Sequence, residues 1–306
     1  LELAEWLTHP DHPLTARVAV NRYWQHFFGR GIVKTTEDFG NQGDLPSHPE
    51  LLDWLALEFI DSGWDVKALV KAMVMSATYR QSSLTSPELR EKDPDNVWLA
   101  RGPKSRLTSE MIRDNALAAS GLLNKKIGGQ SVKPYQPEGL WQMNGGKYTE
   151  DTGDKLYRRS LYTLWKRSVP NPTQATFDQP ERSECTVRRQ KTNTPLQALV
   201  LLNDPTFVET SRKIGEDITK AESTEHGITT AFVKLTGRSP RQEEIKILKT
   251  LRESEYQKFK DDPTRAKGWL EAGAYEIDPS LDTNLVAANA IVASAILNAD
   301  ATINKR

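Results

Sequence analysis

Residues 49–74 read PELLDWLALEFIDSGWDVKALVKAMV, and this stretch sets the fold class. Pro49 stands where the first residue of a helix belongs, and apolar side chains then cover nearly every face up to Ile60, so we expect this helix to be central. Gly63 supplies the left-handed residue that ends it. From Val66 on, apolar residues recur at spacings of three and four, which predicts a second, amphipathic helix.

The same helical spacing continues on both sides of this stretch. Thr108 is a cap residue for a helix that ends at Gly121, and Asp282 or Thr283 opens the last helix. Residues 158–167 differ, because apolar and polar side chains alternate there as in a strand. The fold class is therefore predicted to be mainly α: a multi-helix globular array with a small β-ribbon or sheet near residues 158–167.

The domain organisation follows from length and composition. A chain of 306 residues has a prior of about two domains. Residues 128–154 are rich in Gly, Pro, Gln and Lys, so we expect an irregular segment there. It separates an N-terminal helical region, 1–127, from a strand plus C-terminal helical region, 155–306, unless the two regions share one continuous domain.

The charge balance and the single cysteine exclude several function classes. Lys+Arg and Asp+Glu both number 41, so we expect neither a nucleic-acid partner nor a membrane surface. Cys185 stands alone, which excludes an internal disulfide, a cysteine zinc site and haem c attachment in this chain. The longest apolar stretch, Leu285–Leu297, is too short to span a membrane. Because the chain begins at Leu1 inside an apparent helix, we expect a piece of a longer protein.

A basic stretch gives the candidate ligand-binding residues. Residues 155–191 hold nine Lys or Arg against three acids, with aromatic residues interleaved. Arginine forks bind carboxylate or sulfate and aromatic rings stack on sugars, so an anionic glycan is a sensible ligand. Alternatively, these arginines pair with acids elsewhere in the fold. Arg22 and His26 on a polar face of the Thr15–Phe28 helix are added to this stretch. The candidate ligand-binding residues are Arg22, His26, Trp141, Arg159, Tyr162 and Arg167.

The catalytic residues of any enzyme in this chain are unknown from the sequence, and the candidates are few. Glu110 and Asp114 lie one helical turn apart and form either an acid–base couple or ion pairs with nearby arginines. Asp38 and Asp178 each adjoin a Phe in a loop, where a carboxylate usually accepts backbone hydrogen bonds. His48 precedes Pro49 and either orients that helix or acts as a base. We expect no metal site, because prolines disrupt the His-x-x-His run at 9–12.

Three blocks of sequence carry a family resemblance. The first contains LTARVAVNRYW at 14–24, FGRGIV at 28–33, DFG at 38–40 and PSHPELLDWL at 46–55; the second contains SATYRQSS at 76–83 and EMIRD at 110–114; the third contains RRSLY at 158–162, KR at 166–167, FD at 177–178, TNTPLQAL at 192–199 and LND at 202–204. Over nearly the whole chain they resemble the planctomycete-specific domain of unknown function found at the C-terminal end of planctomycete cytochrome c-like multidomain proteins. The ending at 297–302 is only close, because the family usually has Asp-Glu where Asp300 and Ala301 stand.

The resemblance implies an extracytoplasmic protein, periplasmic or at the cell surface, whose partner is the haem-bearing domain of its parent chain. Haem c would belong to those other parts, so no cofactor is expected in this chain, and the family brings no catalytic residue. Two functions remain open. The chain is either a non-catalytic interaction or scaffold domain that contacts an anionic polysaccharide, or a polysaccharide-active enzyme with Asp/Glu acid–base residues in an arginine-lined cleft. Closed pairing of the polar motif residues favours the first function, and their convergence on an open pocket favours the second.

Overall fold

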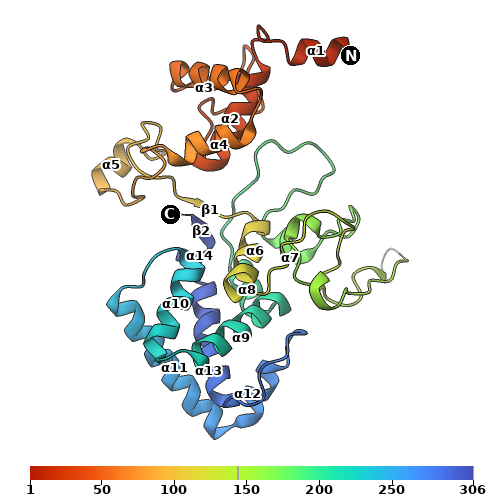
Figure 1. The fold of residues 1–306 in the computed structure, drawn as a ribbon, viewed down its shortest axis with the longest axis vertical. Coiled ribbons are helices and arrows are strands. Elements are labelled where there is room, and N and C mark those ends of the chain that lie inside the picture. Colours follow the sequence, from red (N-terminus) through yellow and green to blue (C-terminus); the bar gives the residue numbers. More distant parts are fainter. Residues whose placement is uncertain (143–144, 306) are drawn as a thin grey trace. The chain divides into compact units, whose positions relative to one another are not determined.

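A computed structural model describes residues 1–142 and 145–305 (Figure 1). The described residues form fourteen α-helices and one sheet of two short strands, so the prediction of a mainly α fold is confirmed. They divide into two compact units, which are described separately. The first unit contains Leu1–Ser105 with the residues from Asn304 on, and the second contains Arg106–Ile303.

The first unit is a small helical body. Its helices are α1 (Glu2–Leu7), α2 (Thr15–Phe28), α3 (Pro49–Asp61), α4 (Val66–Met75) and α5 (Pro87–Lys92). The core contains Val20 and Trp24 of α2, Phe59 of α3 and Met73 of α4. The buried Asn21 side chain bonds both backbone groups of Val33, at 2.9 and 3.0 Å, and so fixes the loop that follows α2.

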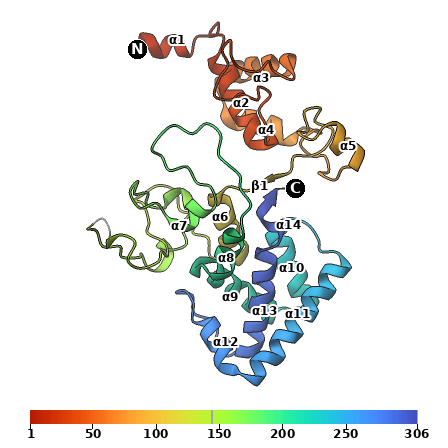
Figure 2. The ribbon, with the colours of Figure 1, turned by 180° about the vertical axis from the view of Figure 1, so that it is seen from behind.

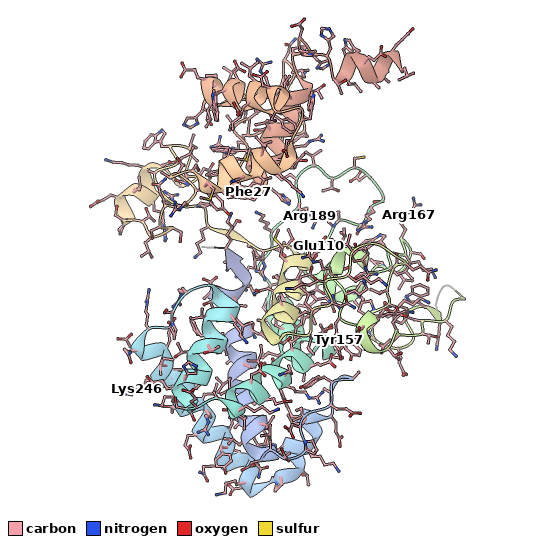
Figure 3. All side chains as sticks on the ribbon, viewed as in Figure 1. Phe27, Glu110, Tyr157, Arg167, Arg189 and Lys246 are labelled. Carbon is pink, nitrogen blue, oxygen red and sulfur yellow. The ribbon has the colours of Figure 1, made fainter. Side chains whose placement is uncertain are left out.

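The C-terminal end of the chain closes onto the same unit. Lys305 Nζ donates to the carbonyl of Phe27 at 2.7 Å and lies 4.1 Å from the centre of the Tyr79 ring. Phe27 is labelled near the end of α2 in Figure 3. The contact joins residues 278 positions apart, and the ammonium lies where the last carbonyls of α2 carry negative charge.

The sequence predicts that α3 is central because apolar residues cover nearly all its faces, but one of these faces is exposed. Leu52, Leu55 and Phe59 pack against α2 and α4, but Trp54 and Leu57 on the opposite face are 56% and 59% exposed. A unit of about 100 residues has too little interior to surround a helix, because a small body buries a smaller share of its surface.

The second unit is built around two helices packed along their lengths. Its helices are α6 (Ser109–Ser120), α7 (Pro172–Thr176), α8 (Pro195–Asn203), α9 (Pro205–Lys220), α10 (Thr224–Thr236), α11 (Gln242–Asp261), α12 (Pro263–Leu270), α13 (Thr283–Leu297) and α14 (Asp300–Ile303). Figures 1 and 2 show α13 running beside α9, with α10, α11 and α12 next to them. Ten of the fifteen residues of α13 are buried, and its Ala-rich sequence permits this close packing. No helix in the described parts of the chain is both long and apolar enough to cross a membrane.

The β structure is small, as predicted, but its predicted position is wrong. Strand β1 (Ser105–Arg106) pairs with β2 (Asn304–Lys305). Residues 158–167 instead contain a short 3-10 helix, η3 (Ser160–Tyr162), and isolated bridges such as that between Val132 and Thr163. Within this segment, the backbones of residues 158 and 160 bond to Arg113 and Asp114 of α6, and those of Tyr162 and Leu164 bond to Val132, so the alternation in the sequence did not produce a ribbon.

Candidate functional site

A buried arginine on α6 holds the irregular part of the second unit. Arg113 is 4% exposed, and its guanidinium donates to the carbonyls of Leu156 at 2.6 Å and Arg158 at 2.8 Å. Burial lowers the pKa of Arg113, and the nearby Asp114 carboxylate opposes that shift. Asp114 itself accepts a hydrogen bond from the backbone of Ser160 at 2.8 Å. These two residues of the EMIRD motif therefore anchor the chain around residues 156–160.

Arg158, in the RRSLY motif at 158–162, also anchors an irregular segment of the chain. Arg158 is buried, donates to the carbonyls of Lys126 at 2.9 Å and Gly128 at 2.7 Å, and lies 3.8 Å from the centre of the Tyr162 ring. The Tyr162 hydroxyl accepts from the backbone of Gly128 at 2.7 Å. Tyr162, a candidate ligand-binding residue, thus stabilises the loop at 126–130.

Glu110 and Arg189 form an ion pair at the start of α6, and Figure 3 shows the two side chains close together. Arg189 Nη1 lies 2.7 Å from Oε2 and 3.0 Å from Oε1 of Glu110, and Gln179 donates at 3.3 Å. Burial alone would raise the pKa of Glu110, but the hydrogen bonds from Arg189 and Ser109 hold that pKa below its ordinary value. Glu110 is therefore held as a carboxylate and not as a proton donor.

The other candidate acid–base residues also have local partners. Asp178 accepts from the backbone and hydroxyl of Thr192, at 2.7 and 2.8 Å. In the first unit, Asp38 accepts from the backbone of Gly40 at 2.7 Å, and His48 Nδ1 lies 3.0 Å from the Ser47 hydroxyl. Asp38 and His48 belong to the first unit, and Glu110, Asp114 and Asp178 belong to the second.

A cluster of two tryptophans and three cations lies on the irregular part of the second unit. Lys166 Nζ lies 4.2 Å from the centre of the Trp141 ring, and the Arg182 guanidinium lies 4.7 Å from that of Trp165. Arg167 follows Lys166 in the chain and is exposed at the edge of the unit (Figure 3). We call Trp141, Trp165, Lys166, Arg167 and Arg182 the tryptophan–cation cluster. A cation covers one face of each ring, so the cluster presents positive charge where an open stacking surface was expected.

The remaining arginines of the basic stretch divide into two groups. Arg189 has an acid partner, whereas the exposed side chains of Arg159, Arg167 and Arg188 have no hydrogen-bond or ion-pair partner among the described residues. Two further ligand candidates, Arg22 and His26, are exposed on α2 in the first unit. The structure therefore leaves part of the positive charge of residues 155–191 available to a ligand.

A buried polar network on α9 is not predicted by the sequence patterns. Glu209 is fully buried, and its Oε1 accepts from the Tyr157 hydroxyl at 2.8 Å, from Tyr135 at 3.3 Å, and from the backbones of Ala274 and Tyr275 at 2.7 and 2.6 Å. Burial, followed by the Glu209 hydrogen bond, raises the pKa of Tyr157. The spacing of polar residues along α9 is typical of a side that faces solvent. The segments that cover Glu209 lie far away in the sequence, so the sequence of α9 does not show that this side is buried.

Two hollows adjoin this interior. One hollow has a volume of about 10 Å³, with room for one water at most, and is lined by Arg113, Gln174 and Asp204. The side-chain Nε2 and Oε1 of the buried Gln174 have no hydrogen-bond partner. The other is an open cleft of about 610 Å³ beside Arg212, lined largely by residues 270–281. Among the described residues there is no group of three or more His, Cys, Asp or Glu side chains arranged to hold a metal ion.

A family model described as PSD1, protein of unknown function (DUF1553), matches residues 1–252. Neither the curated proteins nor the solved structures contain a match to this chain.

Proposed function

The chain belongs to the PSD1 family of proteins of unknown function (DUF1553), and from that premise we propose that it is a non-catalytic interaction domain of a larger extracytoplasmic protein. Its ligand is an anionic polysaccharide, and its binding site is the tryptophan–cation cluster. The planctomycete cytochrome c-like proteins that the motif blocks resemble carry haem in other domains. We therefore propose a haem-bearing domain of the parent chain as its second partner.

Absence of catalysis is supported by the state of the motif residues. Arg113 and Asp114 bind backbone groups of residues 156–160, and Glu110 is paired with Arg189. A general acid must hold a proton near neutral pH, which needs a raised pKa, but the pKa of Glu110 is lowered. These groups stabilise the fold, and Glu110 is not the proton donor that glycoside cleavage needs.

Polysaccharide binding is supported by the cations that the fold leaves unpaired, and this observation carries the proposal. The cluster holds Lys166, Arg167 and Arg182 without an acid partner among the described residues, and exposed Arg159 and Arg188 belong to the same basic stretch. Isolated surface cations bind an anion weakly, but several on one polymer site act together. The two tryptophans give the cations a fixed position, which reduces the entropy lost on binding.

The test is binding of the full chain to heparin, alginate and neutral dextran on a glycan array, at low and at high salt. We expect the two polyanions to bind and added salt to release them, because surface charge pairs are screened. A triple variant, Lys166→Ala, Arg167→Ala and Arg182→Ala, should bind at least about tenfold more weakly. The matched control removes three exposed lysines of the same unit, Lys234→Ala, Lys246→Ala and Lys267→Ala, and should bind like the wild type.

A reducing-sugar assay on the same polymers separates this proposal from the enzyme. We expect no release of reducing ends by the wild type. If the wild type released reducing ends and Asp114→Asn did not, the chain would be a polysaccharide-active enzyme and the non-catalytic proposal would be wrong. Equal weakening by the cluster variant and by the lysine control would show that binding depends on net charge alone and not on this site.

A further inference from the structure

Residues 181–191 belong to the long loop between α7 and α8, which leaves the helices of the second unit in both views (Figures 1 and 2). The structure describes all of these residues, and no backbone group of the segment has a hydrogen bond. Every side chain in it is exposed except that of Arg189, which is half-buried. The backbone of this segment is therefore free to bind another protein.

A protease needs a segment of this kind. Its active site binds the substrate as an extended strand through main-chain hydrogen bonds, so the backbone groups on both sides of the cut must be unpaired. Exposed loops without such bonds are the preferred sites of cleavage, because no local unfolding has to come first. The loop also contains Arg182, Arg188, Arg189 and Lys191, and a basic side chain fits the acidic specificity pocket of a trypsin-like protease.

The side-chain contacts identify Arg188 as the residue before the cut. It is exposed and has no hydrogen-bond or ion-pair partner among the described residues. In contrast, the Arg182 guanidinium lies 4.7 Å from the centre of the Trp165 ring, and Arg189 is paired with Glu110 at 2.7 Å. The side chain before the cut must enter the protease pocket, and Arg188 can do so without losing a contact of its own.

The two ends of the loop are tied together by contacts that this cut leaves intact. Asp178 accepts from the backbone and hydroxyl of Thr192 at 2.7 and 2.8 Å, and Gln197 donates to the carbonyl of Thr176 at 2.9 Å. Lys191 directly precedes Thr192, so cleavage after Lys191 would require this clasp to open. The cut after Arg188 lies inside the clasp, and its two ends stay bonded to each other.

The core also joins the parts of the chain before and after the loop. Helix α6 packs on α9 and α10, and α7 packs on α8. Ile112 and Phe177, which precede the loop, share one apolar core with Phe207 and Ile214, which follow it. Burial of apolar surface does not require an intact chain, so the two fragments remain folded together.

We propose that the peptide bond between Arg188 and Arg189 is a processing site for a trypsin-like serine protease. Hydrolysis adds one water across this bond and leaves a carboxylate on Arg188 and an ammonium group on Arg189. The product is a folded two-chain form made of residues 1–188 and 189–306. The inference does not depend on polysaccharide binding, and its test does not measure that binding.

The test is digestion of the full chain with a small amount of trypsin, followed over time by mass spectrometry. We expect the first cut after Arg188. The fragments 1–188 and 189–306 should separate on a denaturing gel but elute together, at the position of the intact chain, in size-exclusion chromatography without denaturant. A first cut outside residues 181–191 would overturn the proposal, and so would separation of the fragments without denaturant.

Two variants test which bond is cut. Arg188→Gln removes the charge that the protease pocket binds and should slow the first cut at least about tenfold. Arg159→Gln is the matched control, because Arg159 is also exposed and its side chain also has no partner among the described residues, but its carbonyl accepts from the backbone of Tyr162 at 2.9 Å. This control should be cut at the rate of the wild type. Unchanged cleavage of Arg188→Gln, or equal slowing in both variants, would overturn the assignment.

Discussion

A Cβ atom placed on Gly215 of α9 would lie 2.5 Å from the backbone nitrogen of Ala290 on α13 and 2.7 Å from its Cα. The two helix backbones therefore touch at this point, which is consistent with their side-by-side course in Figures 1 and 2. Only glycine permits this approach, because every other residue would place a carbon inside the neighbouring backbone. The contact sets the spacing of the helix pair on which the second unit is built.

Gly215→Ala is predicted to destabilise the protein. Alanine is the better helix former by about 1 kcal/mol, but here its methyl group forces α9 and α13 apart, and overpacking of this kind costs about 1–3 kcal/mol or more. We expect a net loss of at least about 1 kcal/mol in the free energy of unfolding, measured by urea denaturation. The control is Gly268→Ala in α12, where a Cβ meets no atom within 4 Å and should stabilise by up to about 1 kcal/mol. A Gly215→Ala variant at least as stable as the wild type would contradict the backbone contact.

Gly273→Ala is predicted to disrupt the cover over Glu209. Gly273 has φ +85°, and a Cβ there would lie 2.6 Å from the carboxyl carbon of Glu209. The substitution combines backbone strain with a steric clash, and we expect a loss of about 2–4 kcal/mol. Gly237→Ala is the control, because Gly237 has φ +74° but an open surrounding, so that backbone strain of about 1 kcal/mol remains. Equal losses from the two variants, measured by thermal and urea unfolding, would show that the Glu209 contact is unimportant.

Arg113→Ala is predicted to be among the most destabilising arginine substitutions. It removes two charge-assisted hydrogen bonds and leaves the carbonyls of Leu156 and Arg158 without these buried donors, so we expect a loss of about 3 kcal/mol. Arg159→Ala removes an exposed arginine within the same anchored segment and should change the free energy of unfolding by less than about 0.5 kcal/mol. Increased proteolysis of residues 121–170 in Arg113→Ala alone would locate the damage. A loss below about 1 kcal/mol would contradict the anchoring role.

Helix boundaries could be predicted where they depend on local chemistry. Thr108 caps α6 and Gly121 ends it in the left-handed conformation, both as expected from the sequence. Asp282 caps α13 in the same way. These signals act within one turn of the chain, so a single sequence contains them. The exposed face of α3 could not be predicted, because a helix's own sequence does not show whether another layer covers it.

The buried polar groups could not be predicted, because their partners are distant in the sequence. Glu209 combines with Tyr135, Tyr157 and the backbone at 274–275, and no periodicity connects these segments. The sequence predicts an ion pair with the nearby Arg106 or Arg113 as one alternative, but the partner of Glu110 is Arg189. Local patterns show that a side chain is polar, and only the fold determines whether it faces water, backbone or a ligand.

The pH dependence of stability is predicted to contain a contribution from Glu244. Arg238 donates to both carboxylate oxygens, at 2.6 and 2.8 Å, and the backbone of Arg241 donates at 2.7 Å. The hydrogen bonds from Arg238 lower the pKa of Glu244 from 4.5 to about 2. Because the folded state favours the charged form, this stabilisation is complete above the unfolded pKa of 4.5 and is lost as the pH falls towards about 2.

Glu244→Gln should remove this contribution. Both side chains are about one-third exposed, so solvent screening limits the effect to about 1 kcal/mol. We expect the wild type to be more stable than the variant by about that amount near neutral pH, and the difference to shrink as the pH falls from 4.5 to about 2. Urea unfolding at a series of pH values measures it, with Glu243→Gln as the control for removing one carboxylate from the same helical turn. A difference in stability that stays constant over this pH range would mean that Arg238 does not lower the pKa of Glu244 in the folded state.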